Sequence, residues 1–298
     1  MNDFLNKIIP IILIFFLGYF LKRIKLFGKE TADIFLKFIF YVSMPALVFH
    51  SVSQIWLSIK FIYLPFIAFT VFFVIYFITS FIGKKLELSQ KTLGTFILGS
   101  IIMNTGFSLP FIFSAFGEKG VATVAIFDFG NALLVLTFGY YIAMKYGKAE
   151  NTKINYQKLF FLPPIWGLIF GLLFNLIKIP VPTIANNFLN QIGMLTIPLI
   201  MLSIGIYFSP RIKNLSRLLI VLFIRTGIGL LLGFVFASIL NLQGVIKTIV
   251  IICSGAPVGY NTLVFSTLEN LDKEFAANLV SVSILTGIVY IPVLIILF

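Results

Sequence analysis

Charged residues are scarce in this sequence of 298 residues. Only 11% of the residues are charged, whereas 60% are hydrophobic, and the mean hydropathy is +1.09. A soluble domain of this length has far more polar surface. The apolar residues also form long runs, such as 61–82, which contains no charged residue. Because about 20 apolar residues cross a bilayer, the composition predicts an integral membrane protein.

Cysteine and histidine are nearly absent, with one residue of each, Cys253 and His50. This excludes a disulfide framework. The sequence also lacks a cluster of metal ligands, a nucleotide-binding loop and a nucleophile–base arrangement. We therefore predict no bound metal, no cofactor and no enzymatic activity. Cys253 is expected to serve packing, and His50 to lie at the membrane interface.

The apolar runs predict an all-α protein, because hydrocarbon provides no water to satisfy the backbone of other structures. Their lengths fit a ten-helix membrane protein. The predicted spans are 4–21, 33–52, 61–82, 92–116, 121–144, 159–177, 183–208, 215–240, 244–268 and 275–297.

Basic residues divide unevenly between the two sides of these spans. Fifteen of the 22 Lys and Arg residues lie in the loops of one side or at the span ends next to them, and five lie in or next to the loops of the other side. Basic loops remain in the cytoplasm. We therefore predict an inner or plasma membrane protein, surrounded by lipid, with both termini outside the cytoplasm and the loop 145–158 inside it. The net charge of +12 then reflects topology, and no nucleic-acid partner is expected.

The halves 1–144 and 159–298 resemble each other at an offset of 153 residues. An odd number of spans in each half makes the two halves inverted, and inverted repeats are typical of secondary transporters. The matched positions are Pro10 with Pro163, Gly18 with Gly171, Lys25 with Lys178, Pro45 with Pro198 and Gly106 with Gly259.

The fourth and ninth predicted helices contain residues that interrupt a helix, with Pro110 and Pro257 as the predicted breaks. Both breaks fall near the middle of a core about 30 Å thick. Two inverted broken helices can cross there, with half-helix N-termini that attract an anion. Ordinary proline kinks are the alternative. The predicted substrate site comprises Asn104, Thr105, Gly106, Ser108, Pro257, Gly259, Tyr260 and Asn261.

Asp128 and Arg225 are the ionisable residues deep within the predicted spans, where charges are costly and usually functional or paired. They form either a buried ion pair or a functional pair. In the second case Arg225 holds a substrate carboxylate, while Asp128 titrates or binds a coupling ion, H⁺ or Na⁺. Asn131 lies one turn beyond Asp128 and joins the predicted site. Lys37 is expected to extend toward the interface.

Several short motifs occur in a characteristic order along the whole chain. In this order and spacing they resemble the auxin efflux carrier family, which includes plant PIN-type carriers and bacterial malate or malonate permeases. Plant members place a proline before the asparagine of helix four, where this chain has Met103, so the bacterial branch is more similar. The motifs are Met44-Pro45-Ala46-Leu47-Val48-Phe49, Asn104-Thr105-Gly106 with Leu109-Pro110, Leu162-Pro163-Pro164-Ile165, Ile197-Pro198-Leu199 with Gly205, and Ala256-Pro257 with Asn261.

This resemblance implies the architecture shared with sodium/proton antiporters and bile-acid symporters. Helices 1, 2, 6 and 7 would form a scaffold that dimerises, and helices 3–5 and 8–10 a transport domain that moves as an elevator. It also implies that Asn104 contacts carboxylate substrates and that Asn131 lies near the same pocket.

The leading hypothesis is therefore secondary active transport of a small organic anion, such as malate or malonate. A sodium-coupled symporter or a cation/proton antiporter on the same fold is an alternative, although Asp128 is the one acidic residue deep in a span. A membrane sensor without transport is a further alternative.

Overall fold

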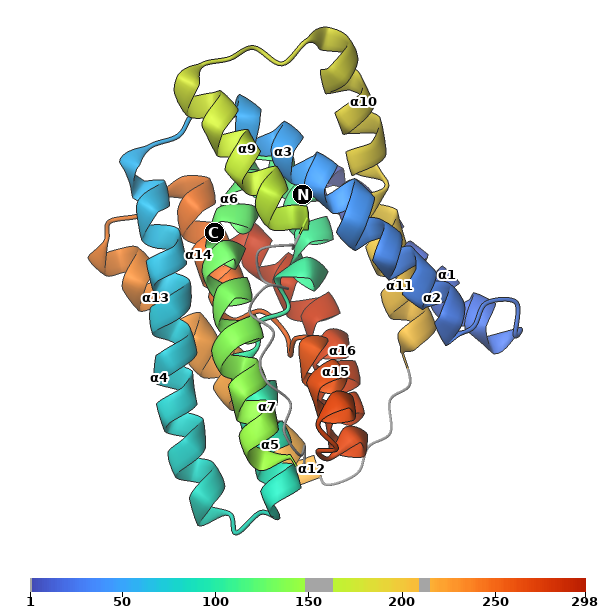
Figure 1. Cartoon of the computed structure of the whole chain (residues 1–298), viewed down its shortest axis with the longest axis vertical. Coiled ribbons are helices and arrows are strands. Elements are labelled where there is room, and N and C mark those ends of the chain that lie inside the picture. Colours follow the sequence, from blue (N-terminus) through green and yellow to red (C-terminus); the bar gives the residue numbers. More distant parts are fainter. Residues whose placement is uncertain (1, 148–162, 209–214) are drawn as a thin grey trace.

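The computed structural model describes residues 2–147, 163–208 and 215–298. Within these ranges the chain consists of helices joined by turns, with one isolated β-bridge between Met103 and Val258. Most helices run along the long axis of the molecule, and α1 and α2 cross them obliquely (Figure 1). The predicted loop 145–158 lies outside the described residues from position 148 onward, as does Leu162 of the predicted motif.

In the first half the helices are α1 (Asn2–Arg23), α2 (Lys29–Phe38), η1 (Ile39–Ser43), α3 (Met44–Gln54), η2 (Ile59–Ile62), α4 (Tyr63–Lys85), α5 (Gln90–Ile101), α6 (Thr105–Leu134), η3 (Val135–Gly139) and α7 (Tyr140–Tyr146). In the second half they are α9 (Pro163–Ile177), α10 (Thr183–Met194), α11 (Thr196–Tyr207), α12 (Leu215–Leu222), η4 (Phe223–Ile228), α13 (Gly229–Ile239), α14 (Gly244–Ser254), α15 (Asn261–Leu268) and α16 (Lys273–Leu297). The segments η1, η3 and η4 are π turns within longer helices.

Among the described residues, six helical stretches are long and apolar enough to cross a membrane, which confirms the predicted all-helical class. Two shorter helices, Pro163–Ile177 and Gly244–Ser254, are also apolar, and the predicted number of ten spans stays a prediction. The six stretches are Lys29–Gln54, Ile59–Lys85, Thr105–Tyr146, Thr183–Tyr207, Leu215–Ile239 and Lys273–Leu297.

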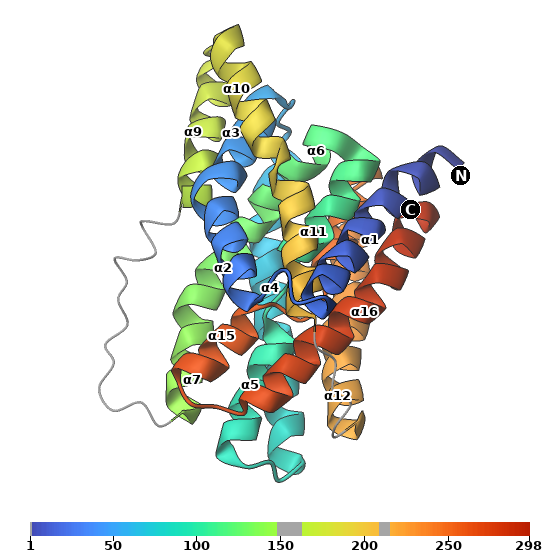
Figure 2. The same cartoon turned by 90° about the vertical axis from the view of Figure 1, so that its right-hand side faces the viewer.

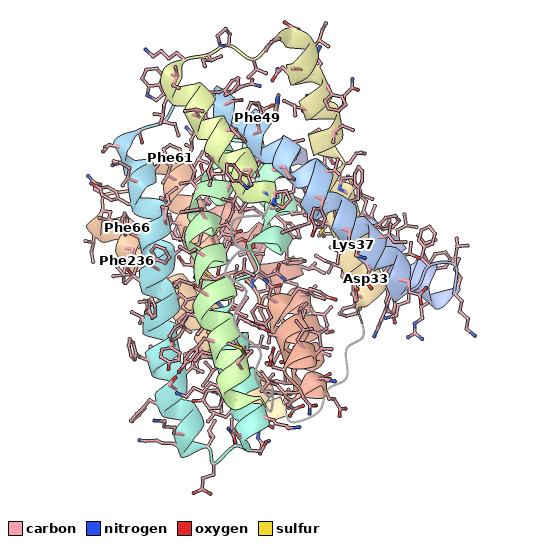
Figure 3. The ribbon with its side chains drawn as sticks, in the orientation of Figure 1. Asp33, Lys37, Phe49, Phe61, Phe66 and Phe236 are labelled. Atoms are coloured by element: carbon pink, nitrogen blue, oxygen red, sulfur yellow. The ribbon has the colours of Figure 1, made fainter. Side chains whose placement is uncertain are left out.

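The helix α4 illustrates why such a sequence suits a bilayer. One face buries Leu64, Ile67 and Val71 against the rest of the protein. The opposite face is equally apolar, and its Phe66 is 62% exposed on the outside of the molecule (Figure 3). A helix that is apolar on all sides needs hydrocarbon around its outer face.

The long helix α6 folds back on itself at Gly117. This glycine has φ 58° and ψ −145°, a conformation that glycine adopts without steric cost. In an unbroken helix Thr105 and Asp128 would be about 35 Å apart. Instead the Thr105 hydroxyl donates a hydrogen bond of 2.7 Å to Asp128 Oδ1. The segments before and after Gly117 therefore lie antiparallel, which brings Asp128 level with the start of α6.

Two helical interruptions occur where the sequence predicts broken helices. The first separates α5 from α6 at residues 102–104, and the second separates α14 from α15 at residues 255–260. Pro257 lies within the second interruption, as predicted. Pro110 does not mark the first one: it lies inside α6, where the backbone remains helical. The break occurs earlier because Asn104 adopts a non-helical conformation and caps the new helix.

The helices form two groups. In the first group α1 and α2 pack on α11, and α3 packs on α9 and α10. In the second group α4 packs on α5 and α6, α14 on α6 and α13, and α16 on α5 and α15. The helix α6 also contacts α1, α3, α9 and α11, so it connects the groups. The helices α3, α9 and α10 reach one end of the molecule, whereas α5, α7 and α12 reach the other (Figures 1 and 2).

Equivalent positions of the two halves have equivalent local structure. Lys25 and Lys178, which are 153 positions apart, are non-glycine residues with positive φ, of 61° and 58°. The Lys25 N–H donates to the carbonyl of Lys22 at 3.0 Å, and the Lys178 N–H to that of Asn175 at 3.2 Å. The same turn thus ends α1 and α9.

Packing between helices repeats with the same offset. A Cβ atom at Gly18 would overlap the carbonyl oxygen of Leu202, and one at Gly171 would lie 3.2 Å from that of Phe49. Phe49 lies on α3 beside α9 (Figure 3). Because Leu202 stands 153 positions after Phe49, the contact between α1 and α11 matches the contact between α9 and α3.

Candidate functional site

The two interrupted helices meet at their breaks. The Asn104 N–H donates to the carbonyl of Pro257, and the Gly259 N–H to that of Ile102, both at 2.9 Å. Met103 and Val258 form the β-bridge between these bonds. At each break some backbone N–H and C=O groups have no partner within their own helix. Part of these groups form hydrogen bonds with the other break instead.

Close contact at this point depends on glycine. A Cβ atom at Gly259 would overlap the side chain of Ile102. With glycine at this position, the two backbones can approach within hydrogen-bonding distance. Gly259, which was predicted as part of the substrate site, thus allows the close approach of the two breaks.

The side chain of Asn104 organises the start of α6. Its Oδ1 accepts a hydrogen bond from the Phe107 N–H at 3.1 Å, which caps the helix. Its Nδ2 donates to the carbonyl of Val258 at 3.2 Å. One amide therefore caps one half-helix and holds the opposite break.

The start of α15 has no side-chain cap. Its first residue, Asn261, is exposed, and Tyr260 before it is half-buried. The first N–H groups of a helix carry the positive end of its dipole and favour anions. The N–H groups of Thr262 and Leu263 donate to the carbonyls of Gly259 and Tyr260, so among the described residues the Asn261 N–H is the group at this helix start that is left to receive an acceptor from outside the chain.

A cavity of about 350 Å³ lies against both helix starts. Its volume falls within the range of small-molecule sites. Apolar side chains from η1, α3, α6 and α9 form much of its wall, including Phe40, Met44, Val48, Val121 and Leu168. The predicted site residues that line it are Asn104, Thr105, Gly106, Asp128, Asn131, Gly259, Tyr260 and Asn261.

A second cavity of about 670 Å³ adjoins the first one. The two share Asn104, Gly106, Tyr260 and Asn261 among their lining residues. The second cavity continues along α2 and α11, where Lys29, Asp33 and Lys37 line it. Asp33 and Lys37 follow one another along α2 (Figure 3).

Asp128 and Asn131 form a polar cluster in the wall of the first cavity. Asp128 Oδ1 accepts hydrogen bonds of 2.7 Å from the Thr105 hydroxyl and from Asn131 Nδ2. Asn131 Nδ2 also donates to the carbonyl of Met103 at 3.3 Å. Asn131 is only 5% exposed, and its Oδ1 has no hydrogen-bond partner.

Arg225 lies away from both cavities, although it was predicted to contact the substrate. It is fully buried in η4, and its guanidinium donates to the carbonyls of Ser100, at 3.0 Å, and Ile101, at 3.4 Å, at the end of α5. It also donates to the carbonyl of Ser254 at the end of α14. Within the described ranges no ion pair joins it to Asp128. The guanidinium instead satisfies the free carbonyls of two helix ends.

Three further predicted residues do not line the cavities. Ser108 is fully buried, and its hydroxyl donates to the carbonyl of Asn104 at 3.5 Å. Pro257 supplies its carbonyl to Asn104, and its ring lies next to Gly287. Pro110 is buried within α6. These residues lie next to the breaks but do not face either cavity.

The structure also reveals a polar contact that sequence analysis missed. His50 is buried, with Nε2 2.8 Å from Glu118 Oε1 and Nδ1 2.8 Å from Asn186 Oδ1. This contact joins α3 and α10 of the first helix group to the turn of α6. Only the rarity of histidine in the sequence pointed to the position, because its partners are 68 and 136 residues away.

Comparison with known proteins identifies similar sequences over nearly the whole chain. The sequence model of a family described as "Membrane transport protein" matches residues 3–295. An uncharacterized transporter of Methanocaldococcus jannaschii is 27% identical over 287 residues, which is 92% of each chain. An uncharacterized transporter of Methanothermobacter thermautotrophicus is 24% identical over 293 residues, or 96% of each chain.

Proposed function

Because the chain belongs to the membrane transport protein family, we propose that it carries a small organic anion, bound where the two interrupted helices meet. Family membership and the apolar helices make it a multi-pass membrane transporter rather than an enzyme. The observation that supports the anion is the pair of helix starts, at Thr105 and Asn261, on one cavity of about 350 Å³.

The chemistry of this cavity favours a carboxylate over a neutral or cationic substrate. Two helix N-termini direct partial positive charge toward the cavity. The exposed Asn261 amide offers a further donor in its wall. A mostly apolar lining would then enclose the carbon skeleton of the anion. A small carboxylate or dicarboxylate meets these requirements.

The architecture that we propose is ten spans in two inverted halves, 1–144 and 159–298. It is supported by the matching turns at Lys25 and Lys178 and by the matching packing of Gly18 and Gly171. In such repeats the substrate binds at the interface of the halves, near mid-depth. The hydrogen bonds between the break at 102–104 and the break at 255–260 support a site at this interface.

We also propose that the two helix groups move relative to each other as an elevator. The first group (α1, α2, α3, α9, α10 and α11) would be a scaffold that dimerises in the plasma membrane. The second group (α4–α7 and α12–α16) would carry the anion, with the contacts of α6 as the sliding surface. Apart from the contacts of α6, the helices of each group pack mainly on one another, which supports this division.

The distribution of basic residues favours a cavity that faces the cytoplasm. Lys29 lines the second cavity and begins α2, directly after the basic turn that follows α1. We place this turn inside the cell together with the loop 145–158. The contact of His50 with Glu118 lies near the C-terminal end of α3, which we place on the outer side of the membrane. The structure would then represent an inward-open state with its outer end closed.

The substitution Asn104→Asp tests the binding site. Aspartate is as good a helix cap as asparagine, so α6 should keep its start. The new charge, however, would repel a bound carboxylate. We expect this repulsion to weaken binding of the carboxylate at least tenfold, which corresponds to about 1.4 kcal/mol.

Binding is measured as the shift in melting temperature of the purified protein with a panel of mono- and dicarboxylates. Asn187→Asp, on the exposed face of α10, is the matched control. If the Asn104→Asp variant is stabilised as strongly as the wild type, the assignment of the site is wrong. If no carboxylate stabilises the wild type, the anion proposal fails.

A further inference from the structure

The carboxylate of Asp128 stands in the wall of the cavity in which we propose an anion. Its Oδ1 accepts the hydrogen bonds of Thr105 and Asn131, whereas Oδ2 accepts none from the described residues. No described Lys, Arg or His forms an ion pair with it. Two negative charges side by side in a cavity with a mostly apolar lining repel each other strongly. Binding of an anion here therefore requires a compensating positive charge.

A second atom of the same cluster indicates where that charge would lie. Asn131 Oδ1 is an acceptor without a partner in a side chain that is only 5% exposed. Buried acceptors nearly always have a partner, and an orphaned one in a native structure needs an explanation, such as an ion. Rotating the amide to exchange Oδ1 and Nδ2 would not pair this acceptor, because Nδ2 already donates to Asp128 and to the carbonyl of Met103.

The geometry of these atoms suits a small hard cation. Asn131 Nδ2 lies 2.7 Å from Asp128 Oδ1, so the two oxygens of this pair are at most about 5 Å apart. When the amide nitrogen lies to one side of the line between the two oxygens, their separation is shorter than this limit. One cation can then contact both at metal–oxygen distances of about 2.4 Å, as found for Ca²⁺, which is close to Na⁺ in size. The Thr105 hydroxyl and the Met103 carbonyl supply further oxygens nearby. Hard cations prefer such a set of oxygen ligands.

We propose that Asp128 and Asn131 bind a sodium ion that occupies the cavity together with the anion. The proposal rests on the proposed function, since it identifies the coupling ion of the same site. Because the ion neutralises Asp128, the anion should bind more tightly when sodium is present, and sodium more tightly when the anion is present. The pair would then cross the membrane together.

Sodium alone is the first probe. The melting temperature of the purified full chain is measured in NaCl, KCl and choline chloride at one pH and one ionic strength. We expect a saturable rise of about 3 °C that is specific to Na⁺. The rise should disappear in Asp128→Asn and in Asn131→Leu, and it should persist in Glu87→Gln, which alters an exposed acidic residue.

Several outcomes would overturn the proposal. One is an equal change in the melting temperature of the wild-type protein in all three salts. This result needs no variant, so it does not depend on how the variants fold. Another is retention of the sodium response in both Asp128→Asn and Asn131→Leu. Stabilisation that follows pH instead of Na⁺ would assign the positive charge to a proton on Asp128.

The second probe is malonate. In NaCl its apparent affinity should be at least fivefold higher than in KCl, which is the lower range of typical coupling between sites. Malonate binding that is equally strong in both salts would refute the coupling and leave the anion site standing. A specific sodium response in a protein that no carboxylate stabilises would refute the proposed substrate class and leave the sodium site standing.

Discussion

At the scale of single residues, Arg225 shows how a buried charge can stabilise a broken helix. Its guanidinium lies at the C-terminal ends of α5 and α14, whose last carbonyls have no partner within their own helices. Those ends also carry the negative part of the helix dipole. The cavity meets the N-terminal ends of α6 and α15. The cationic side chain is thus used for the fold, and the positive helix ends remain available for a ligand.

We therefore expect the Arg225→Met variant to unfold at a lower temperature than the wild type, with no specific effect on binding of the anion. Each carbonyl left without a partner costs about 1–3 kcal/mol, which corresponds to a melting temperature lower by roughly 10 °C in total. Arg225→Lys should lose less, because the charge remains. The check is thermal unfolding with and without malonate, with Lys84→Met as an exposed control. A lysine variant of normal stability that binds malonate tenfold more weakly would instead place Arg225 on the anion.

Residues of the candidate site were predictable from sequence where a polar side chain lies inside an apolar run. Asn104, Asp128 and Asn131 are conspicuous in an apolar chain, and all three line the cavity. The apolar lining residues Phe40 and Leu168 carried no such signal, because every predicted span is rich in similar side chains. The partners of Arg225 could not be predicted either, because they are backbone carbonyls, which every residue has.

At the scale of elements, the sequence indicated which helices break but not the position of each break. Pro257 lies in the interruption after α14, whereas Pro110 lies inside α6. A proline within a helix removes one hydrogen bond and can be tolerated with a slight kink. The cap formed by Asn104 determines where α6 begins. Cap geometry depends on the contact between the two breaks, which no local pattern encodes.

The turn of α6 should be held in place by its contact with α3 and α10. The Glu118 side chain is 42% exposed, so its interaction with His50 contributes about 1 kcal/mol. We expect Glu118→Ala to speed amide hydrogen exchange of residues 115–120 about fivefold. Glu87→Ala, in a different turn, is the control. Unchanged exchange at this turn would mean that packing alone holds it.

At the scale of the whole molecule, the offset of 153 residues in the sequence has structural counterparts. The Thr196 hydroxyl donates to Ser43 Oγ at 2.9 Å, so two equivalent positions contact each other within the first helix group. Likewise, Asn104 bonds to Pro257, its own equivalent. Repeats in the sequence could predict such pairs. They could not predict how the helices divide into two groups, because that division depends on contacts between distant segments.

This division makes cross-links within and between the groups behave differently. Ser43→Cys with Thr196→Cys places a disulfide inside the first group, which should leave transport intact because the group moves as one body. His50→Cys with Glu118→Cys, bridged by a short thiol reagent, ties α3 to α6 across the groups. We expect that bridge to abolish uptake into proteoliposomes of the carboxylate that binds best. Each pair is compared with its own reduced or unbridged form, so that effects of substitution cancel. If the bridge between His50 and Glu118 left uptake intact while the Ser43–Thr196 disulfide blocked it, the moving boundary would lie within the first group instead of along α6.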